Sequence, residues 1–388
     1  MPDRCYFDWN ATAPLRDEAR QALQDALASA GNPSSVHAEG RAARRLVEHA
    51  REEVAALLKA RPADVFFTSS GTEANMLALT PAIETAAEKR PRDRLLISAI
   101  EHSSVRAGGR FPRQAIEELP VGADGRLNLA ALTEAAAKSP RPLVTLMHAN
   151  NETGVVQPVA EAAAIVHAAG GLLHVDAVQA AGRIPCDIGT LGADLLTLSA
   201  HKIGGAKGVG ALVRANDDIH IADPLIRGGG QERGLRAGTE NVAGIAAFGA
   251  AAAIARRDQA AETAHMLKLR NLLETGLKAI SPQAVIFGAG AERLPNTTLF
   301  AAEGMKAETA VIAFDLEGIA VSSGAACSSG KVQPSHVLAA MGVSPPLTRG
   351  AVRVSLGWTT TAIDIERFLG AWRKLATALS KEQSGIAA

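Results

Sequence analysis

The sequence of 388 residues is poor in cysteine and aromatic residues, carries no net charge and lacks a long hydrophobic run. Its three cysteines, Cys5, Cys186 and Cys327, are far apart and form no Cys-x-x-Cys pair, which excludes a disulfide framework and argues against a zinc or other metal site. Equal numbers of basic and acidic residues, 40 of each, argue against nucleic acid or a membrane surface as a partner. No stretch reaches the roughly 18 consecutive apolar residues of a membrane span, and no signal peptide is expected. We therefore expect a soluble, cytoplasmic protein.

The rest of the composition is that of an ordinary globular protein, with 47% hydrophobic and 21% charged residues. Because only 3% of the residues are aromatic, the core must be built mainly from aliphatic side chains. At about 100–200 residues per domain, the length predicts two domains.

Ala-rich segments with helical spacing alternate with short aliphatic runs through the first two thirds of the chain. The helical segments include residues 16–28, 41–59 and 159–169. Five runs are apolar on both faces, and a small or polar cluster follows each of them: 65–68, 95–98, 143–147, 172–175 and 195–198. Doubly buried strands that alternate with helices are typical of parallel sheets. We predict an α/β fold whose large domain has three layers around a mostly parallel sheet.

The last third has a different pattern. From about Val242 to Ile280 the sequence is nearly unbroken helix, which predicts a long helix between two domains. After Pro282, strand patterns near 285–287, 297–300 and 352–356 mix with helical ones near 308–316 and 363–375, which is typical of an α+β domain. The expected division is 15–255 for the large domain, and 1–14 with 256–388 for the small one.

A helix start at the first strand end could bind an anion. Ser69-Ser70-Gly71-Thr72-Glu73 follows the run 65–68 and opens a helical pattern. The free N–H groups and the dipole of a helix N-terminus favour an anion such as phosphate. An ordinary N-cap, with Glu73 in the first turn, explains the same residues, so both interpretations stay open.

Two further strand ends carry an acid and an amine. Asp176 follows the run 172–175, and Lys202 follows the run 195–198 and precedes glycines. Alone, Asp176 could cap a helix and Lys202 could face solvent in a turn. With the anion site, they match what pyridoxal phosphate (PLP) needs, namely a phosphate site, a partner for the pyridinium nitrogen and a Schiff-base lysine. Neither a P-loop nor a fitting Gly-x-Gly-x-x-Gly motif supports another cofactor.

A thiol and a guanidinium complete the candidate site. Gly and Ser surround Cys327, which predicts a mobile, exposed loop at about 322–335 where the thiol could attack a substrate. Alternatively, this cysteine is only a tolerated small residue. Arg353 lies inside the predicted strand 352–356, where it could bind the carboxylate of an amino acid or form a structural ion pair.

Two motifs in combination are highly specific: Ser199-x-His201-Lys202 and Ser322-Ser-Gly-x-Ala-Cys327. Through them the chain resembles the NifS/IscS-type cysteine desulfurases, fold-type I PLP enzymes of the class V aminotransferase family. The resemblance runs nearly end to end, through segments 6–14, 31–37, 68–75, 101–102, 148–156, 174–179, 199–210, 227–241, 322–327 and 352–357.

The resemblance implies a role in cofactor binding for each matched residue. Lys202 is implied to be the Schiff-base lysine that also moves protons, and His102 to stack on the ring and assist proton transfer. The other implied cofactor ligands are Asp176 at the pyridine nitrogen, Gln179 at the phenolic oxygen, Asn151, a phosphate site of Gly71, Thr72, Ser199 and His201, and Thr239 from the neighbouring subunit of a homodimer.

The implied substrate is L-cysteine, with its carboxylate bound by Asn151 and Arg353. Cys327 is implied to take the sulfur as a persulfide, leave L-alanine and pass the sulfur to an acceptor protein for iron–sulfur cluster or other sulfur-cofactor assembly. A selenocysteine lyase or another aminotransferase-type PLP enzyme on this fold is the alternative. Cys327 argues against a transaminase but does not separate cysteine from selenocysteine. Asn75-Met76 departs from the usual Asp-Asn without removing a reacting group.

Overall fold

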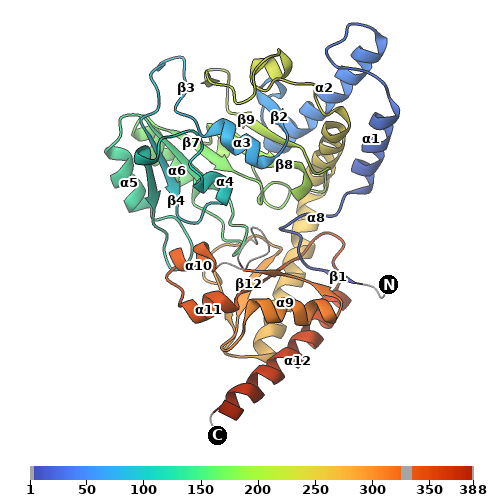
Figure 1. Ribbon diagram of the computed structural model, residues 1–388, viewed down its shortest axis with the longest axis vertical. Coiled ribbons are helices and arrows are strands. Elements are labelled where there is room, and N and C mark those ends of the chain that lie inside the picture. Colours follow the sequence, from blue (N-terminus) through green and yellow to red (C-terminus); the bar gives the residue numbers. More distant parts are fainter. Residues whose placement is uncertain (1–3, 325–333, 387–388) are drawn as a thin grey trace.

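The computed structural model describes residues 4–324 and 334–386. Figure 1 shows an upper lobe built around a large sheet and a lower lobe that contains both labelled chain ends. Helix α8 (Val242–Ile280) runs from the upper lobe into the lower one, with the bounds that the sequence predicts. Its residues Ile245 and Ala255 are buried in the core of the upper lobe, and Leu269 and Leu277 in that of the lower lobe. The domain division near residue 255 stays a prediction.

The main sheet has seven strands in the order β2-β9-β8-β7-β6-β4-β5. Their bounds are β2 (Val65–Thr68), β4 (Arg94–Ser98), β5 (Ile116–Leu119), β6 (Pro142–Met147), β7 (Leu172–Asp176), β8 (Leu195–Ser199) and β9 (Gly210–Arg214). Only β9 runs against the others, since it pairs antiparallel with both β2 and β8. The predicted mostly parallel sheet is confirmed and contains all five predicted strands.

Two strands of this sheet, β5 and β9, were not predicted from the apolar runs of the sequence. The residues of β5 are Ile-Glu-Glu-Leu, too polar for a doubly buried strand, and the strand lies at the sheet edge. Strand β9 begins at the end of the glycine-rich segment after Lys202, which reads as a loop. Its insertion separates β2 from the neighbouring parallel strands.

Helices and loops cover both faces of the main sheet. Leu96 and Leu196 pack on one face, while Leu95 and Leu195 pack on the other, as alternation along a strand requires. The first face is covered by α1 (Asp17–Ala28), α2 (Ala38–Leu58), α5 (Leu129–Ala137), α6 (Val159–Ala168), α7 (Ile188–Leu191) and α8. The second face is covered by α3 (Gly71–Ala78), α4 (Ser103–Arg106) and the short pair β3 (Ile83–Glu84) and β10 (His220–Ile221). The predicted three layers are therefore confirmed.

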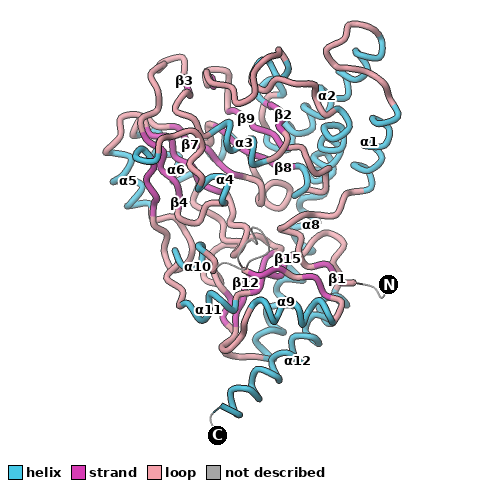
Figure 2. The backbone as a smooth tube through the Cα atoms, in the orientation of Figure 1, coloured by secondary structure: helices cyan, strands magenta, loops and turns pink. Residues whose placement is uncertain are grey.

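The lower lobe contains an antiparallel sheet in the order β11-β12-β15-β14. Figure 2 shows its two central strands, β12 and β15, above α9 and α12. Its strands are β11 (Val285–Ile286), β12 (Thr297–Ala301), β14 (Ser322–Ser323) and β15 (Val352–Ser355), and its helices are α9 (Ala307–Leu316), α10 (His336–Ala340), α11 (Pro345–Gly350) and α12 (Ala362–Ile386). Aromatic rings concentrate in this core, where Phe314 stacks on Phe368 at 4.8 Å and Phe300 meets Trp372 edge-on at 5.1 Å.

The N-terminal segment belongs to the packing of the lower lobe. Strand β1 (Cys5–Tyr6) pairs in parallel with β13 (Ile319–Ala320), and the fully buried Phe7 packs edge-on against Phe368. This arrangement carries the following residues, from Asp8 onward, to the junction between the two lobes.

Both ends of the range predicted for the thiol loop, 322–335, take part in hydrogen-bonded structure. Ser322 and Ser323 form strand β14, and Ser335 caps α10 by accepting a hydrogen bond from the amide of Leu338. Residues 325–333, with Cys327 among them, lie outside the described part of the chain. Cys5 and Cys186 are buried.

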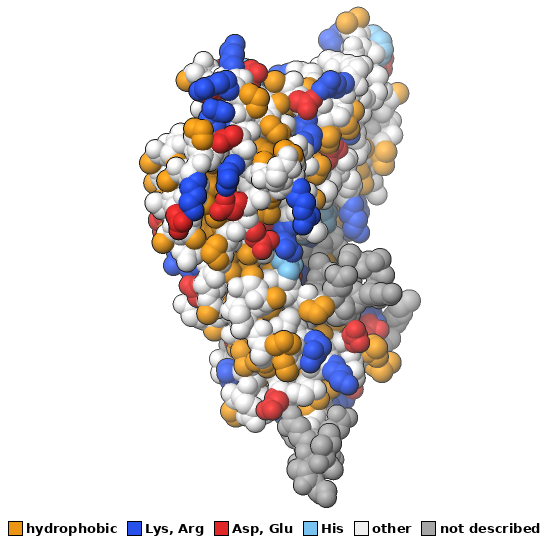
Figure 3. Space-filling model, turned by 60° about the vertical axis from the view of Figure 1, so that its left-hand side comes forward, with side chains coloured by type: hydrophobic (Ala, Val, Ile, Leu, Met, Phe, Trp, Pro, Cys, Tyr) orange, Lys and Arg blue, Asp and Glu red, His pale blue; other side chains and the backbone are white. Residues whose placement is uncertain are grey.

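Basic and acidic side chains are interspersed over the face shown in Figure 3, in keeping with the balanced charge. In the part of the chain that the structure describes, no helix is both long and apolar enough to cross a bilayer. The same residues contain no group of three or more His, Cys, Asp or Glu side chains that could hold a metal ion.

Candidate active site

A cavity of about 500 Å³ lies at the carboxyl ends of the main-sheet strands, facing β14 and β15. It collects ten of the predicted site residues: Gly71, Thr72, His102, Asn151, Asp176, Gln179, Ser199, His201, Lys202 and Arg353. The strands of the main sheet bring all of these residues except Arg353 together, because the carboxyl ends of parallel strands share one edge of the sheet. Arg353 comes from β15 in the lower lobe. Thr239 is exposed and does not line the cavity.

The start of α3 supplies the predicted anion site. Ser70 is the N-cap, and its hydroxyl accepts a hydrogen bond from the amide of Glu73 at 3.1 Å. The first N–H groups of a helix have no acceptor within the helix, so those of Gly71 and Thr72 can bind a ligand. A Cβ at Gly71 would lie 3.0 Å from Val178 and 3.3 Å from Ser199, so glycine permits the close approach of this helix start to the strand ends.

Asp176, the last residue of β7, is buried and held in place by two donors. One carboxylate oxygen accepts from the backbone amide of Val178 at 3.0 Å, and the other accepts from Nδ2 of Asn75 at 2.9 Å. The same Nδ2 donates to Oγ of Ser104. Burial, together with the charge of Asp176, raises the pKa of the neighbouring Glu101 well above its ordinary value.

Lys202 follows β8 in a short 3₁₀ turn, Ala200–Lys202. Its Nζ donates to the carbonyl oxygens of Asn10 at 2.5 Å and Ala11 at 2.8 Å. Burial, with help from the positive charges of Arg353 and Arg183, lowers the pKa of Lys202 from 10.5 to about 7. A large share of this amine is therefore uncharged, and nucleophilic, at neutral pH.

The two predicted histidines are neutral at pH 7. Nδ1 of His102 accepts a hydrogen bond from the amide of Ser104, so the ring proton of the neutral form is on Nε2. Burial, followed by the charge of Lys202, lowers the pKa of His102 despite the opposing effect of Asp176. Burial and the charge of Lys202 also lower the pKa of His201, to about 4, so His201 can bind an anion only as a neutral hydrogen-bond donor.

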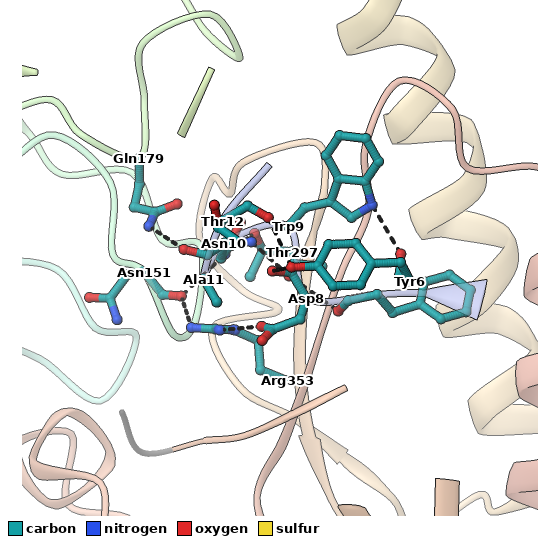
Figure 4. A network of polar contacts seen from close by, with 12 residues as sticks. Tyr6, Asp8, Trp9, Asn10, Ala11, Thr12, Asn151, Gln179, Thr297 and Arg353 are labelled. Carbon is teal, nitrogen blue, oxygen red and sulfur yellow. Dashed lines mark hydrogen bonds and ion pairs between the residues drawn. The ribbon is translucent and has the colours of Figure 1, made fainter. Parts of the chain in front are cut away.

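Arg353 projects from β15 into the cavity wall, where Figure 4 shows it between Asn151 and Asp8. It donates through Nη1 to the carbonyl oxygen of Asn151 at 2.9 Å and through Nη2 to Asp8 at 2.7 Å. Gln179 donates through Nε2 to the carbonyl oxygen of Asn10 at 3.0 Å. The N-terminal segment thus contacts Arg353 and Gln179 as well as Lys202.

The donor set of this cavity fits PLP. The cavity contains a lysine amine with a pKa near 7, a buried carboxylate and the free amides of a helix start. These are the groups that the aldehyde, the ring nitrogen and the phosphate of PLP require, in that order.

Comparisons with known proteins identify the family. The sequence matches the family "Aminotransferase class-V" over residues 5–368. The chain belongs to this family. It is 44% identical to a "Cysteine desulfurase" of Cereibacter sphaeroides, over 95% of this chain and 94% of the relative. It is 38% identical to "Cysteine desulfurase IscS" of Dictyoglomus turgidum, over 98% and 96%.

Solved structures agree with the sequence comparisons. The NifS-like protein from Rickettsia africae superposes with a TM-score of 0.84 at 36% identity, over 96% of this chain and 99% of that protein. The predicted family, the fold-type I architecture and the dependence on PLP are therefore confirmed. The individual residue roles stay predictions.

The structure adds site residues to which the sequence patterns assign no role. Asp8, Asn10 and Ala11 of the N-terminal segment line the cavity, as do Asn75 and Ser104. Tyr6–Pro14 takes part in the family resemblance, which is the one signal that could direct attention to this segment. The argument from strand ends cannot identify the N-terminal segment, because this segment enters the cavity from the lower lobe and not from a strand of the main sheet.

Proposed function

We propose that the chain converts L-cysteine to L-alanine and transfers the sulfur, as a persulfide on Cys327, to an acceptor protein. Relatives named cysteine desulfurase, 37–44% identical over nearly the whole chain, confirm the predicted cysteine desulfurase activity. The observation that carries the residue assignments is a single cavity with the lysine, the carboxylate and the helix start.

Each cavity residue has a task in this proposal. The amides of Gly71 and Thr72, with Ser199 and His201, bind the phosphate of PLP. Asp176, oriented by its two hydrogen-bond donors, binds the ring nitrogen.

Other residues bind the ring and move protons. Gln179 and Asn151 both line the cavity. In this proposal Gln179 contacts the phenolic oxygen of the cofactor, and Asn151 contacts both cofactor and substrate. When bound, PLP makes the Cα proton of an amino acid acidic by accepting its electron pair. Lys202 would hold the cofactor aldehyde, and its Nζ would exchange protons once freed, while His102 can exchange a proton at Nε2.

The sulfur transfer assigned to Cys327 is a displacement at sulfur. Its thiolate attacks the substrate sulfur, an S–S bond forms, and the C–S bond breaks with its electron pair left on the substrate carbon. Protonation of that carbon gives the methyl group of alanine. Arg353 holds the substrate carboxylate, which fixes the position of the reacting sulfur.

We place this enzyme in the cytoplasm as a homodimer. Thr239 is exposed, so it is free to reach the phosphate bound by a second subunit. Iron–sulfur cluster assembly is the proposed use of the sulfur, because a relative over 98% of the chain is named IscS. The proposed acceptor is a scaffold or carrier protein.

The test is to incubate the pure holoenzyme separately with L-cysteine and L-selenocysteine and to measure alanine and protein-bound persulfide. We expect alanine and persulfide in equal initial amounts from cysteine, with the persulfide on the peptide that contains Cys327. Cys327→Ser should bind PLP with an unchanged absorbance spectrum but form no persulfide from cysteine.

Two results would contradict parts of this proposal. Undiminished alanine production from cysteine by Cys327→Ser would remove this thiol from the reaction. Turnover of selenocysteine but not of cysteine would favour the alternative function, a selenocysteine lyase. Cys327→Ser, assayed with the same two substrates, is the control variant for this comparison.

A further inference from the structure

An ion pair in the cavity wall lies beside the proposed substrate site. Nη2 of Arg353 donates to Oδ1 of Asp8 at 2.7 Å, and both residues line the cavity. The side chain of Arg353 is 7% exposed and that of Asp8 is 22% exposed. Removing two charged side chains from water costs free energy, so such an ion pair contributes little to stability by itself.

The backbone fixes Asp8 opposite Arg353. The amide of Phe7 donates to the carbonyl oxygen of Ala320 at 2.8 Å, and the amide of Ser355 donates to the carbonyl oxygen of Phe7 at 2.8 Å. Asp8 then forms a parallel bridge with Ser355. Arg353 lies two residues before Ser355 on β15, so its side chain is on the same face of the strand. Asp8 is therefore part of a rigid frame.

The two contacts leave part of the guanidinium unused. Arginine has five N–H donors in a plane. Asn151 accepts from Nη1 and Asp8 accepts from Nη2, while the buried Nε has no hydrogen-bond partner within the described part of the chain. A buried donor without an acceptor is uncommon, and beside a cavity an oxygen atom of a bound ligand can supply the acceptor. An amino-acid carboxylate supplies two such oxygen atoms.

We propose that Asp8 is a positioning residue, which together with the carbonyl of Asn151 orients Arg353 so that its remaining donors face the substrate carboxylate. This inference rests on the proposed function, because it takes an amino-acid carboxylate as the ligand of Arg353. Without Asp8 the side chain of Arg353 can rotate about its torsions, so the guanidinium no longer has a fixed orientation. The substrate carboxylate then loses a preoriented partner. A residue that serves only the stability of the lobe would have no effect on which ligands bind.

The test compares two ligands that differ only at the carboxylate. Calorimetry measures the dissociation constants of the holoenzyme for L-alanine and for L-alaninamide, which retains the amine but lacks the negative charge. The wild type should prefer L-alanine, and Arg353→Gln should abolish that preference. Asp8→Ala should weaken L-alanine binding by at least about tenfold and change L-alaninamide binding by less than about twofold. Asp8→Asn, which retains an oxygen acceptor for Nη2, should restore most of the preference.

The outcomes separate this inference from the proposed function. If Arg353→Gln abolishes the preference while Asp8→Ala and Asp8→Asn retain it, Asp8 does not position Arg353 and only this inference is wrong. Tighter binding of L-alanine by Asp8→Ala would also overturn it, since Asp8 would then compete with the ligand. If neither the wild type nor Arg353→Gln distinguishes the two ligands, the carboxylate site itself is wrong, and both proposals fail there.

Discussion

The lowered pKa of Lys202 makes a prediction about the apoprotein that needs no catalysis. Its pKa is about 7 because burial disfavours the charged amine and Arg353 and Arg183 repel it. At pH 8 an amine with this pKa is ~90% uncharged, whereas a lysine amine with the ordinary pKa of 10.5 is ~0.3% uncharged. The difference in reactive amine is therefore about 300-fold.

The assay is brief reductive methylation with formaldehyde between pH 5.5 and 10, followed by peptide mass spectrometry. Labelling of Lys202, relative to its own maximum, should rise through pH 7 and level off above pH 8, because only the uncharged amine reacts. Lys138 is an internal reference, since its hydrogen bond to Glu134 raises its pKa above 10.5 and labelling should still be rising at pH 10.

Two substitutions give opposite shifts. Arg353→Gln removes a positive charge that lowers the pKa of Lys202, so the labelling midpoint should move to higher pH. Asp8→Asn removes a negative charge that raises it, so the midpoint should move to lower pH. Labelling of Lys202 that rises in parallel with that of Lys138 would refute the argument that burial activates this amine.

Two further predictions concern the frame around the site. Gly210→Ala would place a Cβ 2.4 Å from the carbonyl carbon of Ser70, so it should cost about 1–3 kcal/mol of stability and speed the loss of PLP on dialysis; Gly290→Ala, with open space around the new Cβ, should do neither. Glu232→Ala removes the bidentate partner of the buried Arg51 and should lower the free energy of unfolding in urea by about 3–5 kcal/mol. An unchanged urea midpoint at constant slope would show that water replaces the carboxylate there.

The main sheet was predictable because doubly buried parallel strands have a distinctive sequence. Runs such as Leu95–Ser98 and Leu195–Ser199 are short, apolar on both faces and followed by polar clusters. The same rule misses β5 and β9, since one is polar at the sheet edge and the other begins at a glycine-rich turn. An apolar-run argument finds strands only where both faces are buried by apolar side chains.

The candidate site was predictable to the same extent as the sheet. Asp176 ends β7 and Lys202 follows the neighbouring β8, so their convergence follows from the direction of the strands alone. The hydrogen bond from Asn75 to Asp176 was not predictable, because it depends on how α3 packs against the strand ends. Periodicity indicates that a helix is present, but it does not fix which polar side chain a neighbouring strand end meets.

The contacts of the N-terminal segment were not predictable from strand patterns, because they join residues far apart in the sequence. Asp8 and Arg353 are 345 residues apart in sequence, and Asn10 and Lys202 are 192 apart. Phe7 anchors the segment in the core of the lower lobe. From there Asn10 and Ala11 extend to the upper lobe, where their carbonyl oxygens accept hydrogen bonds from Lys202. One short segment therefore sets the surroundings of the amine and of the guanidinium at once. A substitution there should alter cofactor capture and carboxylate binding together, whereas a substitution of Asp176 at the end of β7 should alter cofactor capture alone.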